Sequence, residues 1–279
     1  MKDRNQKQLN RPHLKLFHIS LFICLSGLFF ASDTLYAASI ETDTGVIGYD
    51  DTPKLSWCEY LVHDPHRPLP VYVNPGPSME PAPAPSDAIV LFDGKDLSKW
   101  QKNSWQLVDN HAQSGKGPLK TKQSFGNFQL HLEFMTPADT SGNFWNRGNN
   151  GLYIMGYYEV QIFDSHPSHK KKIYPDGQCA AIYGQTPPLV NACRKPGQWQ
   201  TYDIIFIAPV FENDKLVKPA MITMLHNNIL VHLNTTVHGP TGHRQIKKYK
   251  PHPTKLPLVF SAHNSPVRFR NIWVRPLPE

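Results

Sequence analysis

Short runs of alternating apolar and polar residues dominate the chain after Asp87 and predict antiparallel β-structure. From Asn127 to Met135, apolar side chains occupy every second position, so one face of this strand is predicted to be buried. The run from Leu152 to Phe163 alternates in the same way, and its second face carries polar and aromatic side chains. Further strands are predicted at 200–207, 220–226, 229–233, 256–262 and 267–274.

The connections between these runs are short and rich in turn residues. Asn227 and Asn228 follow His226 between two apolar runs and indicate a hairpin, because Asn tolerates the positive φ that such turns require. Many strands at this spacing, without helices between them, predict an all-β sandwich or jelly roll of two antiparallel sheets. The same pattern excludes a parallel α/β enzyme.

The part of the chain before Asp87 has a different texture. Residues 41–86 show little periodicity and many prolines, which predicts an extended Pro-rich arm ending in a stiff linker. Apolar residues around Trp57 predict that this arm packs on the domain that follows, although a small separate domain is an alternative. The predicted organisation is an arm at 38–86 and a jelly roll at 87–279.

The first residues are typical of a secretory signal. Five Lys or Arg residues precede the apolar run from Leu16 to Phe30, and small residues follow at Ala37 and Ala38. We therefore expect residues 1–37 to be a signal peptide cleaved near Ala37, with a periplasmic or secreted product. A retained membrane anchor is the alternative, but the run of about 15 residues is shorter than the ~20 needed to span a bilayer.

Charge, cysteines and missing motifs narrow the function. A formal net charge of +7 without a long basic run argues against a nucleic-acid partner. No P-loop, GxGxxG, HExxH, GxSxG or CxxC motif occurs, so no nucleotide cofactor is expected. Beyond the predicted signal there are three cysteines, Cys58, Cys179 and Cys193, and the last two could either bridge a loop or remain free.

The polar face of the 152–163 run is the most suggestive local constellation. Tyr157, Glu159 and Gln161 are alternate residues on this face, and Glu133 could join them from another strand of the same sheet. Aromatic rings stack on sugars, while carboxylates and amides bind their hydroxyl groups. The pattern therefore predicts a sugar-binding surface, with a merely solvent-exposed outer sheet as the alternative.

Two histidines stand at strand ends. His226 precedes a hairpin turn, and His263 follows a strand and lies near Arg268 in the predicted sheet. A histidine in such a position could act as a base or a metal ligand, because its ordinary pKa lies near neutrality. Exposed histidines without a role are the alternative.

Five separated segments resemble the secreted 3-keto-disaccharide hydrolase domain family, formerly a domain of unknown function, in the order in which that family has them. They are residues 91–100, 158–165, 182–188, 199–205 and 267–273, and the likeness covers 87–277. The resemblance implies a concanavalin-like jelly roll. It also implies action on oligosaccharides or glycosides whose C3 hydroxyl has been oxidised to a ketone by a separate oxidoreductase.

The chemistry that the resemblance implies needs few groups. A ketone at C3 acidifies the proton on C2, so a base can remove it, and the resulting enolate expels the C1 aglycone by β-elimination. Addition of water then gives net hydrolysis. One base and donors or a cation for the enolate oxygen are required, but not the carboxylate pair of ordinary glycosidases.

The resemblance and the strand pattern together give the candidate residues. Glu159, Glu133 and His226 are the catalytic candidates. The substrate-binding candidates are Gln161, Tyr157, Asn150, Arg147, His263 and Arg268. A divalent cation such as Ca²⁺ would suit the carboxylates of Glu133 and Glu159.

The chain departs from its relatives near His263. Ser261 and Ala262 stand where relatives often carry an amide and a carboxylate, and Tyr157 stands where many carry Arg. Altered substrate choice and loss of catalysis are both consistent with these differences. A non-catalytic carbohydrate-binding module is therefore an alternative to the enzyme, and an interaction domain whose Pro-rich arm docks a partner is a third hypothesis.

Overall fold

The computed structural model describes residues 38–278, apart from residues 79, 82 and 140. The predicted signal peptide, residues 1–37, lies outside the described residues. Within the described part of the chain, no helix has the length and apolar character needed to cross a bilayer.

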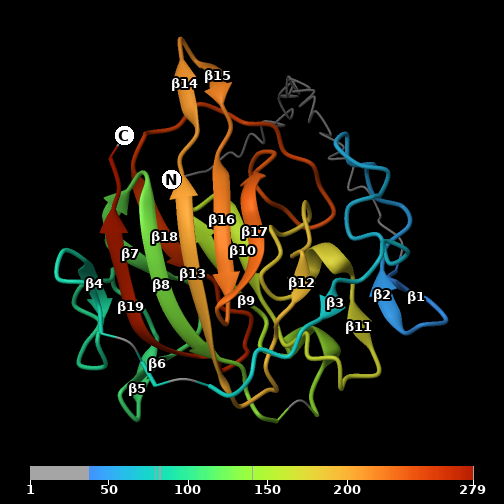
Figure 1. Cartoon of the computed structure of the whole chain (residues 1–279), viewed down its shortest axis with the longest axis horizontal. Coiled ribbons are helices and arrows are strands. Elements are labelled where there is room, and N and C mark those ends of the chain that lie inside the picture. The colour runs from blue at the N-terminus through green and yellow to red at the C-terminus, as the bar shows by residue number, and fades with distance from the viewer. Residues whose placement is uncertain (1–37, 79, 82, 140, 279) are drawn as a thin grey trace, which may run out of the picture. The chain divides into compact units, whose positions relative to one another are not determined.

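The larger of the two main sheets has eight strands, all paired antiparallel (Figure 1). These strands are β4 (Ile89–Phe92), β5 (Gln106–Val108), β6 (His111–Gln113), β8 (Phe128–Met135), β13 (Trp199–Ile207), β16 (Met221–His226), β17 (Ile229–Thr236) and β19 (Arg268–Pro276). Their order is β17-β16-β13-β8-β19-β6-β5, and β4 pairs with β19.

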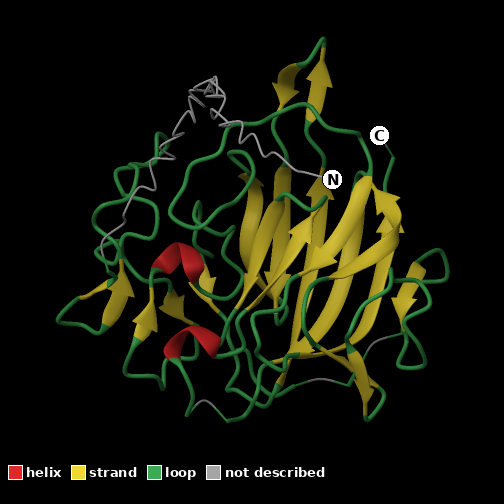
Figure 2. Ribbon diagram, turned by 180° about the vertical axis from the view of Figure 1, so that it is seen from behind, coloured by secondary structure: helices red, strands yellow, loops and turns green. Residues whose placement is uncertain are grey.

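The smaller main sheet has four antiparallel strands in the order β10-β9-β18-β7. They are β7 (Leu119–Phe125), β9 (Asn150–Ile154), β10 (Tyr158–Ile162) and β18 (Leu256–Phe260). Two single-turn 3-10 helices, η1 (Phe144–Asn146) and η2 (Pro175–Gly177), are the helical segments of the described residues (Figure 2).

The inner faces of these two sheets share one hydrophobic core. Leu132 and Phe134 of β8 and Tyr158 and Val160 of β10 are all fully buried members of the same cluster. Burying one face of each sheet against the other removes apolar surface from water, which is the main driving force for this packing. The predicted all-β jelly-roll sandwich is confirmed.

The strand pattern predicted the framework from β8 onward, but it missed β4, β5, β6 and β7 and treated β9 and β10 as one strand. The hairpin between β16 and β17 turns at Asn227 and Asn228, whose φ angles are 54° and 64°. The run from Leu152 to Phe163 is wrong as a single strand, because a tight turn at Met155 and Gly156 divides it into β9 and β10. Unbroken alternation would place Met155 on the same face as Tyr153 and Tyr157, but Met155 packs in the core instead.

The segment before Asp87, here called the N-terminal segment (residues 38–86), pairs with loops of the sandwich through short strands. These strands and the remaining ones are β1 (Ile40–Glu41), β2 (Val46–Gly48), β3 (Val71–Tyr72), β11 (Lys172–Ile173), β12 (Val190–Asn191), β14 (Val210–Glu212) and β15 (Lys215–Lys218). Strand β2 runs parallel to β11, and β3 runs parallel to β12.

A buried histidine joins the N-terminal segment to η2. The backbone N–H of His63 donates to the carboxylate of Asp176 over 3.0 Å, and its ring Nδ1 lies 3.2 Å from the other carboxylate oxygen. Both residues are fully buried, and the His63 ring stacks on Tyr174 at 4.0 Å between centroids. The N-terminal segment is thus held by specific buried contacts as well as by strand pairing.

Cys179 and Cys193 are free thiols that are both buried in the core. Their side chains are hydrogen-bonded to each other, and the Cys179 sulfur lies 3.0 Å from the hydroxyl of Tyr202. Of the two alternatives left open by the sequence, the structure contains the free pair.

Truncating a buried side chain of the N-terminal segment tests whether this segment is part of the cooperative fold. Leu55 is 1% exposed, so Leu55→Ala is expected to lower the free energy of unfolding by about 2–5 kcal/mol in urea titrations. Val71 is 74% exposed in the same segment, and Val71→Ala should change the free energy of unfolding by less than ~0.5 kcal/mol. Equal, small effects of the two substitutions would show that the packing of this segment does not contribute to the free energy of unfolding.

Candidate functional site

A pocket of about 380 Å³ opens on the outer side of strands β9 and β10. Five aromatic side chains, two histidines, two amides, one carboxylate and one isoleucine line it. The lining residues are Tyr49, Trp145, Asn149, Tyr153, Glu159, Gln161, Ile173, Tyr174, Tyr183, His243 and His263.

Strand alternation places the polar side chains in this pocket. Tyr158 and Val160 point into the core, so Glu159, which lies between them on β10, points the opposite way. In the pairing with β9, Glu159 stands opposite Tyr153, and Gln161 stands opposite Gly151. Cross-strand partners share a face of the sheet, so these positions converge on one surface.

Gly151 provides the space that the Glu159 carboxyl group occupies. A Cβ atom at position 151 would lie 2.1 Å from Oε1 of Glu159 and 2.9 Å from its Cδ, which is far inside van der Waals contact. Any side chain at this position would displace the carboxyl group. Gly151 is therefore needed for this rotamer of Glu159.

Burial dominates the electrostatics of Glu159. The residue is 5% exposed, and burial raises the pKa of its carboxyl group from 4.5 to about 8. A hydrogen bond from Tyr153 and the positive charge of Lys247 both favour the ionised form, but they offset only part of this effect. At neutral pH the carboxyl group is mostly protonated, and it becomes a stronger base than an ordinary carboxylate once it ionises.

The pKa values of the two histidines in the pocket are lowered, whereas that of Glu159 is raised. Burial, together with the nearby His63 and Arg244, lowers the pKa of His243 to about 4. Burial also lowers the pKa of His263. Because both pKa values are lowered, both imidazoles are neutral hydrogen-bonding groups at pH 7. Nδ1 of His243 lies 3.0 Å from the hydroxyl of Tyr183.

The N-terminal segment supplies one wall of the pocket. The ring of Tyr49 lines it, and the guanidinium of Arg244 lies 4.0 Å from the centroid of this ring. Arg244 is also ion-paired with Asp51 over 2.5 Å. Behind this wall, His63 stacks on Tyr174, whose hydroxyl is 2.8 Å from that of Tyr183.

The structure brings three of the sequence-predicted residues together in this pocket: Glu159, Gln161 and His263. Arg147 lies outside it and lines a separate smaller cavity. Asn150 is fully buried, with its side-chain oxygen accepting a hydrogen bond from the Gly151 N–H. The prediction chose the wrong member of the Asn149–Asn150 pair, because alternation along β9 turns Asn150 away from the pocket.

The expectation that Glu133 shares a sheet with Glu159 is wrong. Glu133 belongs to β8 in the eight-stranded sheet, between the core residues Leu132 and Phe134, so it faces outward on the other side of the sandwich. Its carboxylate accepts hydrogen bonds from Arg270 over 2.7 Å and from Asn271 over 2.9 Å. Burial opposes its ionisation, but the hydrogen bonds prevail and lower its pKa.

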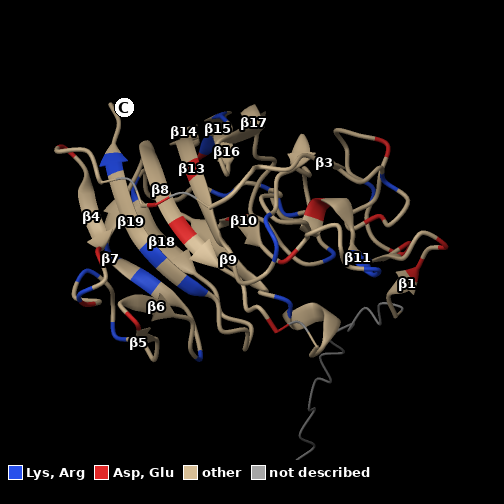
Figure 3. Ribbon diagram, turned by 60° about the horizontal axis from the view of Figure 1, so that its bottom comes forward, with Lys and Arg blue, Asp and Glu red and all other residues tan. Residues whose placement is uncertain are grey.

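Opposite charges also pair elsewhere on the surface, and Figure 3 shows both signs spread over strands and loops. Glu133 is buried, but its carboxylate is paired with Arg270 in the same way on the outer side of the eight-stranded sheet.

The other sequence candidates also lie outside the pocket. His226 is buried in the eight-stranded sheet, where its Nε2 lies 2.9 Å from Gln200, and burial with the charge of Arg194 lowers its pKa to about 3. Arg268 hydrogen-bonds Gln113 near the edge of that sheet. Tyr157 is 42% exposed beside the β9–β10 turn and stacks on His252.

Several lining residues were not among the sequence candidates. Tyr153 had a signal, because it alternates with Leu152 and Ile154 and so shares the outer face of its strand. Tyr183 and His243 lie in loops without periodicity, and only the tertiary structure brings them to the pocket.

The predicted calcium site does not fit the arrangement of the two carboxylates. Glu133 and Glu159 face outward from opposite sheets with the core between them, so they cannot ligate one ion. Among residues 38–278 as described, no group of three or more His, Cys, Asp or Glu side chains could hold a metal ion.

Comparisons with known proteins place these features in context. Residues 87–275 match the family model of the 3-keto-alpha-glucoside-1,2-lyase-like domain. A protein of Parabacteroides distasonis ATCC 8503, described as a "putative glycosyl hydrolase", is 37% identical, with a TM-score of 0.65 over 72% of this chain and 94% of that one. A second protein from this organism with the same description is 16% identical and shares the fold, with a TM-score of 0.51 over 69% and 94% of the two chains. The comparison with curated proteins found no match.

The raised pKa of Glu159 predicts a specific pH dependence of stability. Between pH 4.5 and about 8 the folded protein holds a proton that the unfolded chain has lost, so stability contributed by this group falls as the pH rises through that window. Glu159→Gln removes this dependence. In urea titrations, the free energy of unfolding of the variant relative to that of the wild type should increase by a few kcal/mol, to order of magnitude, from pH 5 to pH 9.

The exposed residue Glu212 provides the matched control, because Glu212→Gln should track the wild type over the same range. Parallel curves for the wild type and Glu159→Gln would show that the carboxyl group has an ordinary pKa.

Proposed function

The chain belongs to the family of 3-keto-alpha-glucoside-1,2-lyase-like domains, and on this premise we propose that it is a periplasmic or secreted enzyme that cleaves 3-keto-glycosides. The observation that carries the proposal is the buried carboxyl group of Glu159, with a pKa raised to about 8, in an aromatic-lined pocket. A base of this kind suits the removal of a proton from carbon, since a pKa close to the operating pH combines basicity with availability.

The pocket contains the groups that would hold a sugar. Tyr49 and Trp145 offer ring faces or edges for the apolar side of a pyranose. Gln161 and Asn149 offer amides for its hydroxyl groups. A pocket of about 380 Å³ with few convergent polar groups is of the size that small ligands occupy.

The proposed reaction uses the chain's own side chains in the first step. The carboxylate of Glu159 removes the proton from C2 of the sugar, and the electron pair of that bond forms the enolate of the C3 ketone. Neutral His263, neutral His243 and the amide of Gln161 are among the lining groups that can donate hydrogen bonds to the enolate oxygen.

Collapse of the enolate breaks the bond between C1 and the glycosidic oxygen, and the departing oxygen takes up a proton. The product is an enone, and water added across its double bond gives net hydrolysis. The substrate comes from an oxidoreductase that converts a C3 hydroxyl to a ketone.

A non-catalytic carbohydrate-binding module is the second candidate function. Ser261 and Ala262, next to His263, lack the amide and carboxylate that relatives often have there. The Ser261 hydroxyl is buried without a hydrogen-bond partner, so it does not replace the missing groups. This candidate predicts binding of unoxidised glycans without any product.

Replacing the proposed base tests the enzyme directly. Glu159→Gln is expected to lower kcat on a 3-keto-disaccharide by roughly 10²- to 10⁴-fold, because the amide cannot accept the C2 proton. NMR detection of the released second sugar measures the rate, and the same spectra reveal an enone intermediate. Glu212→Gln should leave kcat unchanged, and equal rates for all three proteins would remove Glu159 from the mechanism.

The same assay in the presence of a chelator tests the sequence-based prediction of a calcium ion. Because Glu133 and Glu159 cannot share one ion, turnover is expected to be unchanged by the chelator. Loss of turnover on chelation, with recovery on adding Ca²⁺, would contradict this expectation.

The pH profile gives an independent check on the role of Glu159. As a base it must be ionised, so kcat/KM should rise with pH and level off above about 8, the pKa of the free enzyme. Initial rates between pH 5 and pH 10 provide the measurement. A profile that falls through pH 8 would instead identify Glu159 as the acid that protonates the leaving group.

A further inference from the structure

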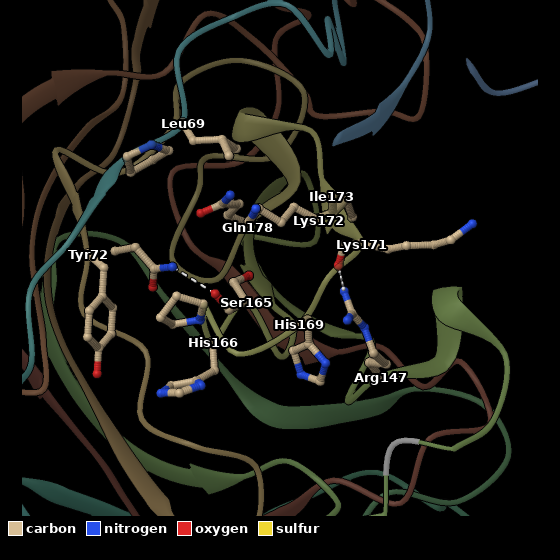
Figure 4. Close-up of a pocket in the computed structure, with 13 residues that line it drawn as sticks. Leu69, Tyr72, Arg147, Ser165, His166, His169, Lys171, Lys172, Ile173 and Gln178 are labelled. Carbon is tan, nitrogen blue, oxygen red and sulfur yellow. Dashed lines mark hydrogen bonds between the residues drawn. The ribbon is translucent and has the colours of Figure 1, made fainter. Parts of the chain in front are cut away.

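We infer that a second, smaller cavity beside the candidate site binds an oxyanion, such as a carboxylate or phosphate group. This basic cavity has a volume of about 70 Å³ (Figure 4). The lining residues that matter for binding are Arg147, Ser165, Lys172 and Gln178. The lining includes an arginine, two lysines and two histidines but no carboxylate.

Arg147 is the central feature of this cavity. It is 7% exposed, and the single hydrogen bond of its side chain among the described residues runs from Nη2 to the carbonyl of Lys171 over 3.2 Å. The Nε–H group is buried without a partner. The guanidinium packs near the rings of Phe144 and Phe163, at 4.6 and 5.3 Å from their centroids.

No carboxylate of the described residues forms an ion pair with Arg147. Asp164 is the nearest acidic influence on it, but that carboxylate already accepts from the His166 N–H and pairs with the ring of His169. Burial accordingly lowers the pKa of the Arg147 guanidinium. Asp164 offsets only part of the cost of burying this cation, and an anion in the adjoining cavity would offset more of it.

Other groups around the cavity complete an anion site. Gln178 is 4% exposed, and its amide oxygen is buried without a hydrogen-bond partner. This oxygen is an acceptor, so only the NH₂ group of the side chain can donate to an anion. Lys172 adds a second positive charge, and the Ser165 hydroxyl, which accepts from the Cys179 N–H, retains its own proton to donate. Figure 4 shows the Lys171 side chain pointing away, and its ammonium group pairs with Glu41.

The basic cavity adjoins the candidate site through one short segment. Trp145 and Asn149 line the larger pocket, Arg147 between them lines the cavity, and Ile173 borders both. The bound oxyanion can therefore come from two sources: a free anion, or an acidic group on a saccharide. The inference does not depend on the proposed reaction.

Binding measurements on the purified full chain test this inference. Titrations use inorganic phosphate, acetate, glucuronate and, as the uncharged comparison, glucose, at constant ionic strength set with sodium chloride. The wild type is expected to bind at least one of the anions, and Arg147→Gln should weaken that binding by about tenfold or more, because charge-assisted hydrogen bonds are lost. Arg275→Gln, which removes an exposed arginine charge of β19, is the matched control and should bind like the wild type.

The anion series distinguishes the sources. Binding of phosphate or acetate alone identifies a free anion, whereas glucuronate binding without phosphate, acetate or glucose binding identifies an acidic group carried by a sugar. If Arg147→Gln does not fold, Lys172→Gln is the second test, and this variant is expected to bind the anion more weakly than the wild type does. Absence of anion binding by the wild type, or unchanged binding by these variants, would overturn the inference whatever the outcome of the activity assay.

Discussion

The carboxyl group of Glu159 is enclosed by the protein, and the arrangement of the candidate site follows from that burial. An ionised carboxylate is poorly tolerated in a low-dielectric environment, so its pKa rises to about 8. The carboxyl group fits only because Gly151 has no side chain opposite it, and Tyr153 donates the hydrogen bond that orients it. The same burial keeps the neighbouring imidazoles neutral, so the pocket collects uncharged donors around one proton acceptor.

Holding these groups in place requires more than the sandwich itself. The family match begins at residue 87, yet Tyr49 forms a wall of the pocket, and His63 supports Tyr174 from behind. Parallel pairing with β11 and β12 and the buried contact between His63 and Asp176 attach this segment to the loops that carry the site. The N-terminal segment is therefore a structural part of the candidate site, and it closes the basic cavity as well through Leu69 and Tyr72.

Prediction from sequence succeeded where a local periodicity decided the outcome. The alternation on β10 correctly gave the outward direction of Glu159 and Gln161, and the Asn227–Asn228 turn was visible from residue type alone. Glu133 faces outward from its own strand, as alternation requires, but that strand belongs to the other sheet. Outward faces of two packed sheets point in opposite directions, which alternation along one strand cannot reveal.

The sequence by itself determined the class of fold, the face of each strand and, through five family-like segments, the class of chemistry to consider. Only the tertiary structure decided which outward-facing residues share a pocket, since that depends on strand pairing between distant segments. It alone brought the loop residues Tyr183 and His243 to Glu159 and left Arg147 buried without a direct ion pair among the described residues. The physical reason is that burial and charge compensation are properties of the packed chain, whereas periodicity is a property of its local geometry.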